Sequence, residues 1–245
     1  MTKRMKKILY IAYQPYKWCI FVPFLVVSTL FFGFLTIILV PLTNPKFASY
    51  ICGALWSRLN GYMTPMTVSV HGRSNMDKKQ SYVIVCNHQS HYDVFVLYGW
   101  LGVDFKWVMK QELRKVPGLG IGCEKVGHIF IDRSNREKAL ESLNDAKKKV
   151  VNGTSVIFFP EGTRSRNGGL GEFKKGAFMM ALDLGLPILP ITITGTSKIL
   201  PAHTFKLMPG KAHIYIHSPI DITGYSEKNI YELMEKTRKI IASKL

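Results

Sequence analysis

The sequence places side chains with catalytic potential directly after several of its apolar segments. The first such cluster, residues 87–93, contains a histidine and an aspartate five positions apart, His88 and Asp93. A carboxylate that accepts a hydrogen bond from one imidazole nitrogen fixes the tautomer of the ring. The other nitrogen is then left to take a proton from a hydroxyl group. Such a pair could therefore supply general-base chemistry, with His88 as the base and Asp93 orienting it.

The spacing of this pair requires a particular local structure. On one continuous helix, residues five apart point about 140° away from each other. If His88 lies instead in a strand-to-helix turn and Asp93 in the first helical turn, the side chains can meet and the helix dipole favours the carboxylate. His91 is a rival base, although two residues apart on a helix it does not face Asp93. From the spacing alone, helix-capping Asn87 and Asp93 beside a spectator histidine are the favoured interpretation.

Three further polar clusters follow apolar segments later in the chain. They are residues 110–112 with Lys110 and Glu112, residues 132–133 with Asp132 and Arg133, and residues 160–165 with Glu161, Gly162, Thr163 and Arg164. Random loops would produce one or two such clusters, so their repetition indicates a site. For Glu161 and Arg164 the alternative is a surface ion pair, which contributes ~0–1 kcal/mol. For Lys110 the alternative is a solvated lysine.

The elements that must position these clusters begin at about residue 66. Short apolar segments predict buried strands at residues 82–86, 105–109, 128–131, 155–159 and 188–193. Amphipathic segments predict helices at residues 134–150, 175–184 and 230–241. This alternation predicts an α/β fold with a largely parallel central sheet flanked by helices. In such sheets the site lies beyond the carboxyl ends of the strands, where all four clusters would meet.

The N-terminal 65 residues have a different composition. Five cations and no acidic residue precede residue 19, and residues 19–42 carry no charge. This run is long enough to cross a bilayer, which needs roughly 20 apolar residues. The cations before it would keep the N-terminus on the cytoplasmic side.

Three kinds of segment fit this pattern. A cleaved signal peptide usually has a shorter apolar region and a small-residue cleavage site. A single span would place the rest of the chain across the membrane. A re-entrant or interfacial helix keeps it on the cytoplasmic side, and Pro23, Gly33 and Pro41 favour such a bent or shallow insertion. With a second helix at residues 46–59, we expect an apolar helical membrane anchor over residues 1–65 and a catalytic domain over residues 66–245.

Net charge and composition limit the classes of molecule that this protein is expected to bind. The formal net charge is +17, from 33 Lys and Arg against 16 Asp and Glu, which favours an anionic membrane surface, an acidic carrier protein or nucleic acid. No zinc spacing or RNA-binding signature is present, and the apolar N-terminus argues against nucleic acid. The four cysteines lie far apart in the sequence, so neither a disulfide framework nor a metal site is expected.

Taken together, the clusters resemble the conserved blocks of a known enzyme family. Residues 87–93 resemble the N-H-x-S-x-x-D block of the glycerolipid acyltransferases, specifically the 1-acylglycerol-3-phosphate (lysophosphatidate) acyltransferases. Residues 159–165 match the F-P-E-G-T-R-S block of that family in full. Residues 127–133 resemble the block between them, which ends in arginine, and residues 186–191 resemble the last, apolar-proline block.

The resemblance implies a role for each cluster. His88 would deprotonate the free sn-2 hydroxyl of 1-acylglycerol 3-phosphate, with Asp93 orienting it, and that hydroxyl would attack the thioester of acyl-CoA or an acyl carrier protein directly. No cofactor beyond this co-substrate is implied. The glycerol phosphate acceptor would be held by Glu161, Gly162, Thr163 and Arg164, with help from Arg133 and Lys110. Arginine suits this role because its planar fork pairs with phosphate oxygens bidentately.

Other functions remain open from sequence. The same blocks could acylate glycerol 3-phosphate or another lysophospholipid. A membrane-anchored hydrolase of the nucleophile-elbow type would carry G-x-S-x-G, which is absent from the sequence. A lipid-binding module without catalysis would not need His88.

Overall fold

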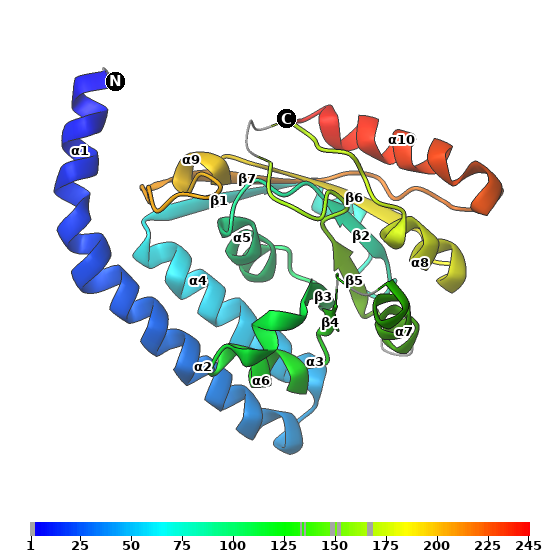
Figure 1. Cartoon of the computed structure of the whole chain (residues 1–245), viewed down its shortest axis with the longest axis horizontal. Coiled ribbons are helices and arrows are strands. Elements are labelled where there is room, and N and C mark those ends of the chain that lie inside the picture. Colours follow the sequence, from blue (N-terminus) through cyan, green and yellow to red (C-terminus); the bar gives the residue numbers. More distant parts are fainter. Residues whose placement is uncertain (1–2, 133, 135, 148–149, 151–152, 166–168) are drawn as a thin grey trace.

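The computed structural model describes residues 3–132, 134, 136–147, 150, 153–165 and 169–245. Over these residues the chain forms a seven-stranded sheet covered by helices on both faces (Figure 1). The strands are β1 (Met66–His71), β2 (Val83–Cys86), β3 (Phe105–Lys110), β4 (Ile129–Ile131), β5 (Ser155–Phe158), β6 (Ile188–Thr194) and β7 (Gly210–Ile216). Their order is β1-β7-β6-β2-β5-β3-β4. Only β6 and β7 pair antiparallel, so the predicted fold class is confirmed.

The central strand β2 shows why the five predicted strands were visible in the sequence. All four of its residues are buried. Ile84 and Cys86 point into a core on one face of the sheet, and Val83 and Val85 into a second core on the other. A strand covered on both faces has no polar positions, so it stands out as a continuous apolar run.

The strands β1 and β7 were not predicted. Both alternate between buried and exposed residues, because helices cover only one of their faces. Thr67, Ser69 and Lys211 stand on the outer face, where they break the apolar run. These two strands pair parallel with each other and extend the sheet beyond β6.

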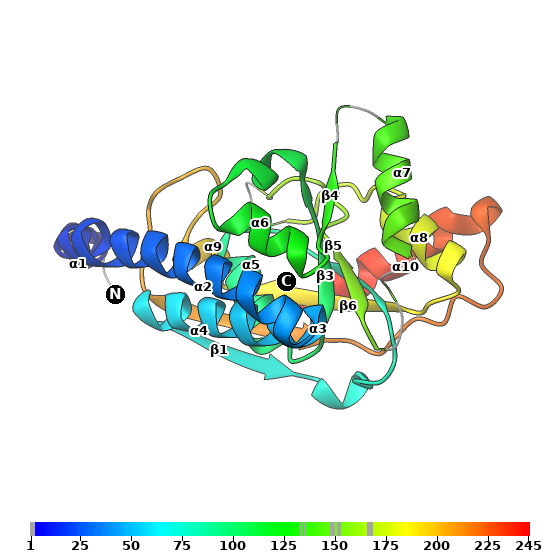
Figure 2. The ribbon, with the colours of Figure 1, turned by 90° about the horizontal axis from the view of Figure 1, so that it is seen from below.

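Two groups of helices cover the sheet. The first core lies under α5 (Tyr92–Trp100) and α4 (Ala54–Met63), and the second under α7 (Arg136–Lys147), α8 (Gly176–Leu184) and α10 (Ile230–Ala242). Figure 1 shows α10 and the C-terminus on the opposite side of the sheet from α2 and α4. Figure 2 shows α7, α8 and α10 at the end of the molecule away from α1. Two shorter helices, α6 (Leu119–Lys125) and α9 (Thr196–Ile199), complete the set.

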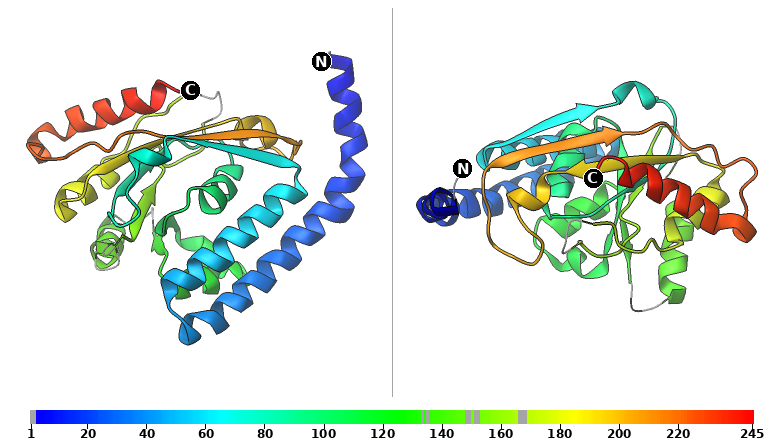
Figure 3. Two further views of the ribbon diagram at one scale, coloured as in Figure 1. Left: turned by 180° about the vertical axis from the view of Figure 1, so that it is seen from behind. Right: turned by 90° about the horizontal axis from the view of Figure 1, so that it is seen from above.

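The N-terminal region is a long helical hairpin. Its first arm runs through α1 (Lys3–Tyr16), a π-helical turn (Lys17–Phe21) and α2 (Val22–Leu42). The second arm runs through α3 (Pro45–Ala48), another π-helical turn (Ser49–Gly53) and α4, and it returns alongside the first (Figure 3). Within the described residues, one stretch, Ile8–Leu42, is long and apolar enough to cross a membrane. The second helix predicted at residues 46–59 is present and longer than expected.

The breaks expected in the apolar run do not occur. Pro23 is the second residue of α2, which follows directly on the π-helical turn Lys17–Phe21, and Pro41 lies inside α2 one residue before its end, yet the helix continues through both. Gly33 lies inside α2 and is used for close packing, because a side chain there would collide with the backbone of Gly118. The expectation that these residues interrupt the helix was therefore wrong.

Candidate active site

The His88–Asp93 pair lies at the carboxyl end of β2, in the turn that leads into α5. Asp93 is in the first turn of α5, as the spacing required, and its side chain is fully buried (0% exposed). Its Oδ2 accepts three hydrogen bonds, from His88 Nδ1 (2.8 Å), from the backbone N–H of Gln89 (2.7 Å) and from that of Ser90 (2.9 Å). Backbone donors at a helix N-terminus stabilise the ionised carboxylate. Oδ2 of Asp93 is thus held in place against one nitrogen of the imidazole.

The ring of His88 is held by aromatic stacking as well. It lies on the ring of Phe159, with centroids 3.9 Å apart and planes 11° from parallel. Trp107 stacks on Phe159 in turn, at 5.9 Å. The His88 side chain remains 16% exposed. Because Asp93 occupies Nδ1, Nε2 is the nitrogen left to face a substrate.

The backbone of His88 is tied to the loop that follows β5. Its N–H donates to Glu161 Oε1 (2.9 Å), and its carbonyl accepts from the N–H of Ser165 (2.8 Å). The other carboxylate oxygen of Glu161 accepts from the N–H of Gly171 (2.7 Å), and Glu161 is only 7% exposed. Both Glu161 oxygens therefore hold backbone amides, a contact that sequence reasoning missed when it assigned this residue to the acceptor.

Two other polar residues of the first block support the same turn, and sequence reasoning gave them no role. The buried side-chain amide of Asn87 donates to the carbonyl of Ile193 (2.9 Å) and accepts from its N–H (2.7 Å), which extends the β2–β6 pairing. The hydroxyl of Ser90 donates to the carbonyl of Leu200 (2.7 Å) and accepts from the N–H of Tyr92 (3.1 Å). Polar residue types at fixed positions around His88 were the signal that could have identified them.

A cleft of about 1410 Å³ is lined by the loop after β5 that holds the His88 backbone, although His88 and Asp93 are not themselves among its lining residues. The predicted residues Glu161, Thr163 and Arg164 line it, together with the cationic side chains of Lys174, Lys175 and Arg238 and with His203. Gly162 forms the turn that begins this wall, with a left-handed φ of 72°, and a side chain there would press on Lys174. The cleft is therefore rich in groups that pair with an anion.

The two candidate bases, His88 and His91, differ in their contacts with Asp93. The pKa of His91 is lowered from its usual value, first by desolvation and then by the positive charge of Arg164. His91 therefore stays neutral at pH 7, but it makes no contact with Asp93 comparable to the His88 bond.

Lys110, by contrast, does not line this cleft. Lys110 is the last residue of β3, and its ammonium pairs with Glu112 Oε1 at 2.6 Å in an exposed position. The Lys110 hydrogen bond lowers the pKa of the Glu112 carboxyl. Arg133 lies outside the described residues. Among those described, no group of three or more His, Cys, Asp or Glu side chains is arranged to hold a metal ion.

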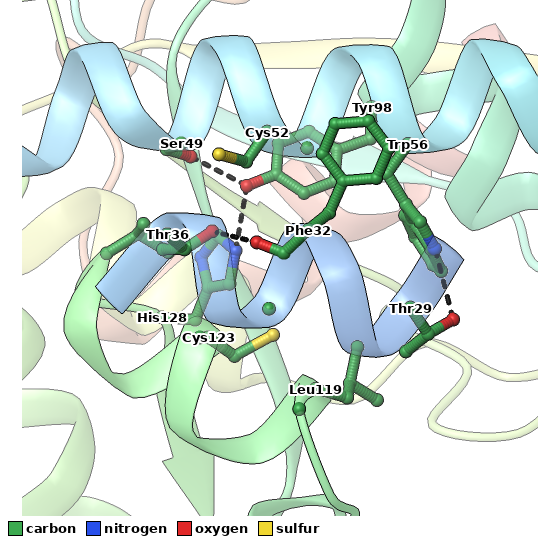
Figure 4. A pocket seen from close by; sticks show the side chains of 15 residues that line it. Thr29, Phe32, Thr36, Ser49, Cys52, Trp56, Tyr98, Leu119, Cys123 and His128 are labelled. Atoms are coloured by element: carbon green, nitrogen blue, oxygen red, sulfur yellow. Dashed lines mark hydrogen bonds between the residues drawn. The ribbon is translucent and has the colours of Figure 1, made fainter. Parts of the chain in front are cut away.

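A second, small cavity of about 60 Å³ lies between α2, the start of the α3–α4 arm, and α6 (Figure 4). A hydrogen-bonded chain crosses it from Ser49 to Tyr98 OH (2.6 Å) and from Tyr98 OH to His128 Nε2 (3.0 Å). His128 Nδ1 accepts from the N–H of Trp107 (3.3 Å), so its Nε2 carries the proton and donates to Tyr98. Burial raises the pKa of the Tyr98 hydroxyl. The chain thus ties the second arm of the helical hairpin to β3.

Comparison with known proteins agrees with this geometry. The family model described as Acyltransferase matches residues 67–194, which contain the turn after β2 and the loop after β5. The chain is 32% identical over 210 residues to the 1-acyl-sn-glycerol-3-phosphate acyltransferase of Escherichia coli, covering 82% of this chain and 81% of that protein.

Two further relatives extend the comparison. A chloroplastic 1-acyl-sn-glycerol-3-phosphate acyltransferase of Brassica napus is 36% identical over 177 residues, 71% of this chain and 51% of that protein. The chain thus spans about half the length of such chloroplast relatives. The crystal structure of the 1-acyl-sn-glycerophosphate acyltransferase PlsC from Thermotoga maritima superposes with a TM-score of 0.79 at 28% identity, covering 99% of this chain and 95% of that one.

Proposed function

The chain belongs to the family of the 1-acyl-sn-glycerol-3-phosphate acyltransferases, and from that premise we propose that it converts 1-acylglycerol 3-phosphate to phosphatidate. The acyl group would come from a thioester, either acyl-CoA or an acyl carrier protein. The observation that carries the proposal is the 2.8 Å bond between His88 Nδ1 and Asp93 Oδ2, beside a cleft whose wall includes Arg164.

His88 acts as the general base in the proposed reaction. Its Nε2 takes the proton of the sn-2 hydroxyl as the oxygen attacks the thioester carbonyl carbon, and the positive imidazolium is stabilised by Asp93. The tetrahedral intermediate collapses with cleavage of the C–S bond. The departing thiolate takes the proton back from His88, so the base is regenerated in each turnover. A thioester is already activated, and no acyl-enzyme is required.

Arg164, Thr163 and Gly162 form the proposed acceptor site. The guanidinium of Arg164 pairs with the acceptor phosphate, which needs a charged partner to leave water. Arg133 and Lys110 remain phosphate ligands predicted from the sequence; because Lys110 does not line the cleft, it could reach only a phosphate bound outside it. Glu161 belongs to the same wall, and because both its oxygens bind backbone amides, we propose that it acts first by holding His88 in place.

The helical hairpin provides the proposed attachment to a membrane. One side of α2 is buried against the protein at Ser28, Phe32, Gly33 and Thr36. Two hydrogen bonds join it to α4, from Trp56 Nε1 to Thr29 and from Asn60 Nδ2 to Ser28. The other side is exposed and apolar. A helix with these contacts would take part of the folded domain into the bilayer if it spanned, which supports insertion into one leaflet with the catalytic domain on the cytoplasmic side.

The proposal is tested by an acceptor series. Purified full-length protein in mixed micelles is given an acyl-CoA or an acyl carrier protein thioester, with lysophosphatidate, glycerol 3-phosphate, lysophosphatidylcholine or monoacylglycerol as acceptor. We expect the highest kcat/KM with lysophosphatidate. Equal or better turnover of another acceptor would redefine the substrate, and hydrolysis of the thioester without acceptor would indicate a hydrolase instead.

A further inference from the structure

One surface of the catalytic domain combines exposed apolar side chains with cations. It consists of the 3-10 turn Gln111–Lys115 and α6, joined at residues 116–118, and is called the 111–125 hairpin here. Leu113, Val116 and Ile121 are exposed on it, Ile121 by 46%. None of them belongs to either hydrophobic core. Clustered apolar side chains left in solvent indicate an interaction surface.

The hairpin lies directly against α2. A Cβ atom added to Gly122 would lie 3.2 Å from the Cα of Gly33. One added to Gly118 would lie 3.1 Å from the Cα of Leu30. Figures 1 and 2 both show α6 beside the middle of α2. Because the glycines leave no side chains between the two backbones, the exposed surfaces on either side of the contact adjoin each other.

The exposed side of α2 is apolar along its length. It is formed by Val26, Val27, Leu30, Phe31, Phe34 and Ile38, with Phe34 exposed by 65%. Leu30 is both an exposed member of this row and a contact of Gly118, and Ile121 precedes the glycine that touches Gly33. The apolar surface therefore continues from α2 onto the hairpin, although the two are about eighty residues apart in the sequence.

The net charge of the hairpin indicates which kind of partner its apolar surface would bind. The hairpin contains three cations, Arg114, Lys115 and Lys125, and two acids, Glu112 and Glu124; with Lys110, which directly precedes it, the net charge is +2. Glu124 pairs with Arg114 at 3.2 Å, and Glu112 pairs with Lys110. An apolar surface bordered by excess cations suits the headgroup region of a bilayer containing anionic lipids. A second copy of this chain would bring like charges together.

We propose that the 111–125 hairpin inserts into an anionic membrane surface beside α2, so that the catalytic domain itself contacts the bilayer. The inference rests on the proposed membrane attachment and goes beyond the N-terminal helices. The hairpin connects β3 to β4, so its insertion fixes the orientation of the sheet relative to the bilayer. The cleft beside His88 is then held at a set distance from the lipid that carries the acceptor.

Fluorescence of an introduced tryptophan tests the insertion. Ile121→Trp and Leu245→Trp are compared in the full-length chain, because both parent residues are exposed by 46% and Leu245 ends the chain on the side of the sheet away from α2 (Figure 1). The vesicles contain zwitterionic and anionic lipids brominated along their acyl chains. After subtraction of the parent spectrum, we expect the Ile121→Trp emission to shift to shorter wavelength and to be quenched several-fold more than that of Leu245→Trp.

Charge removal provides a second measurement. Lys115→Gln and Lys125→Gln should each weaken binding to anionic vesicles roughly fivefold, the usual contribution of one cation at such a surface. Lys228→Gln, in the 3-10 turn before α10, serves as the matched control and should leave binding unchanged. Equal effects at all three positions would indicate only a general dependence on net charge and would overturn the placement of the hairpin.

The outcomes separate this inference from the proposed function. If the parent protein sediments with vesicles but Ile121→Trp is no more quenched than Leu245→Trp, the hairpin lies in water and the inference fails while membrane attachment stands. If the parent does not sediment, both the attachment and the inference fail, and activity in micelles is judged separately. A blue shift without vesicles that grows with protein concentration would show that a second copy covers the surface, and would also overturn it.

Discussion

Replacing Glu161 with glutamine distinguishes a residue that positions the base from one that binds the acceptor. Oε1 holds the N–H of His88 and Oε2 that of Gly171. A glutamine offers one oxygen and one NH2 group, so one backbone N–H would face a donor. A hydrogen bond to a charged group contributes ~1.5–3 kcal/mol and a neutral one ~0.5–1.5 kcal/mol. Losing one charged bond and weakening the other costs about 2–4 kcal/mol of local stability.

That loss should displace the His88 turn, because this N–H and the Ser165 bond to the His88 carbonyl are what attach it to the loop after β5. A displacement of about 1 Å in a catalytic group can cost roughly 10²-fold in rate. For Glu161→Gln we therefore expect kcat to fall roughly 10- to 100-fold, while KM for lysophosphatidate changes by less than about threefold.

Steady-state kinetics with saturating acyl donor measure both constants, and thermal unfolding checks that the variant is folded at the assay temperature. Glu172→Gln is the matched control, because Glu172 lines the same cleft but is exposed. It should leave kcat unchanged. If Glu161→Gln instead raises KM for lysophosphatidate tenfold and keeps kcat, the carboxylate binds the acceptor and the positioning role is refuted.

Three other experiments test the identity of the base, the role of Arg164 and the packing of α6 against α2. His88→Ala should lower kcat roughly 10²- to 10⁴-fold, the usual contribution of a general base, whereas His91→Ala should keep most turnover; the reverse result would transfer the role to His91. Arg164→Ala should lower kcat/KM for lysophosphatidate roughly 10- to 150-fold, from ~1.5–3 kcal/mol for a charged hydrogen bond, but change turnover of monoacylglycerol little. An equal loss on both acceptors would remove Arg164 from the phosphate. Burial raises the pKa of the Cys123 thiol to about 12, so at pH 8 it stays protonated, and mass spectrometry should find it alkylated by iodoacetamide far more slowly than in the urea-unfolded protein. Rapid modification of Cys123 would contradict the packing of α6 against α2.

The sequence revealed those parts of the fold whose neighbours cover them completely. Strands such as β2 and β6 are buried on both faces, and their residue types alone required a strand in the middle of a sheet. The edge strand β1 has one face in solvent, where Thr67 and Ser69 weaken the apolar signal. Proline and glycine in α2 were misleading for a different reason, because their effect depends on where the helix ends and on which neighbour packs against it.

In the site, contacts between residues close in the sequence were predictable, whereas contacts between distant residues were not. The bond between His88 and Asp93 spans five residues, and a local turn is enough to make it, so the spacing predicted its geometry. The bond from the His88 N–H to Glu161 joins residues 73 apart, and that between Asn87 and Ile193 joins residues 106 apart. No local pattern encodes such pairs. They depend on the strand order, in which β5 and β6 are the two neighbours of β2.

That strand order also explains why residues of two distant blocks serve one base. Val85 of β2 pairs with Phe158 of β5, so the residues that follow the two strands emerge side by side at the same edge of the sheet. Phe159 then lies under the imidazole ring, and the next residues of its loop reach the backbone of His88. Asp93 fixes the rotation of the ring, Phe159 its plane, and the loop after β5 the position of its backbone. A general base whose position is set by two adjacent strands needs no contribution from the substrate to become ordered, so the binding of the acceptor can be used to align the hydroxyl with Nε2.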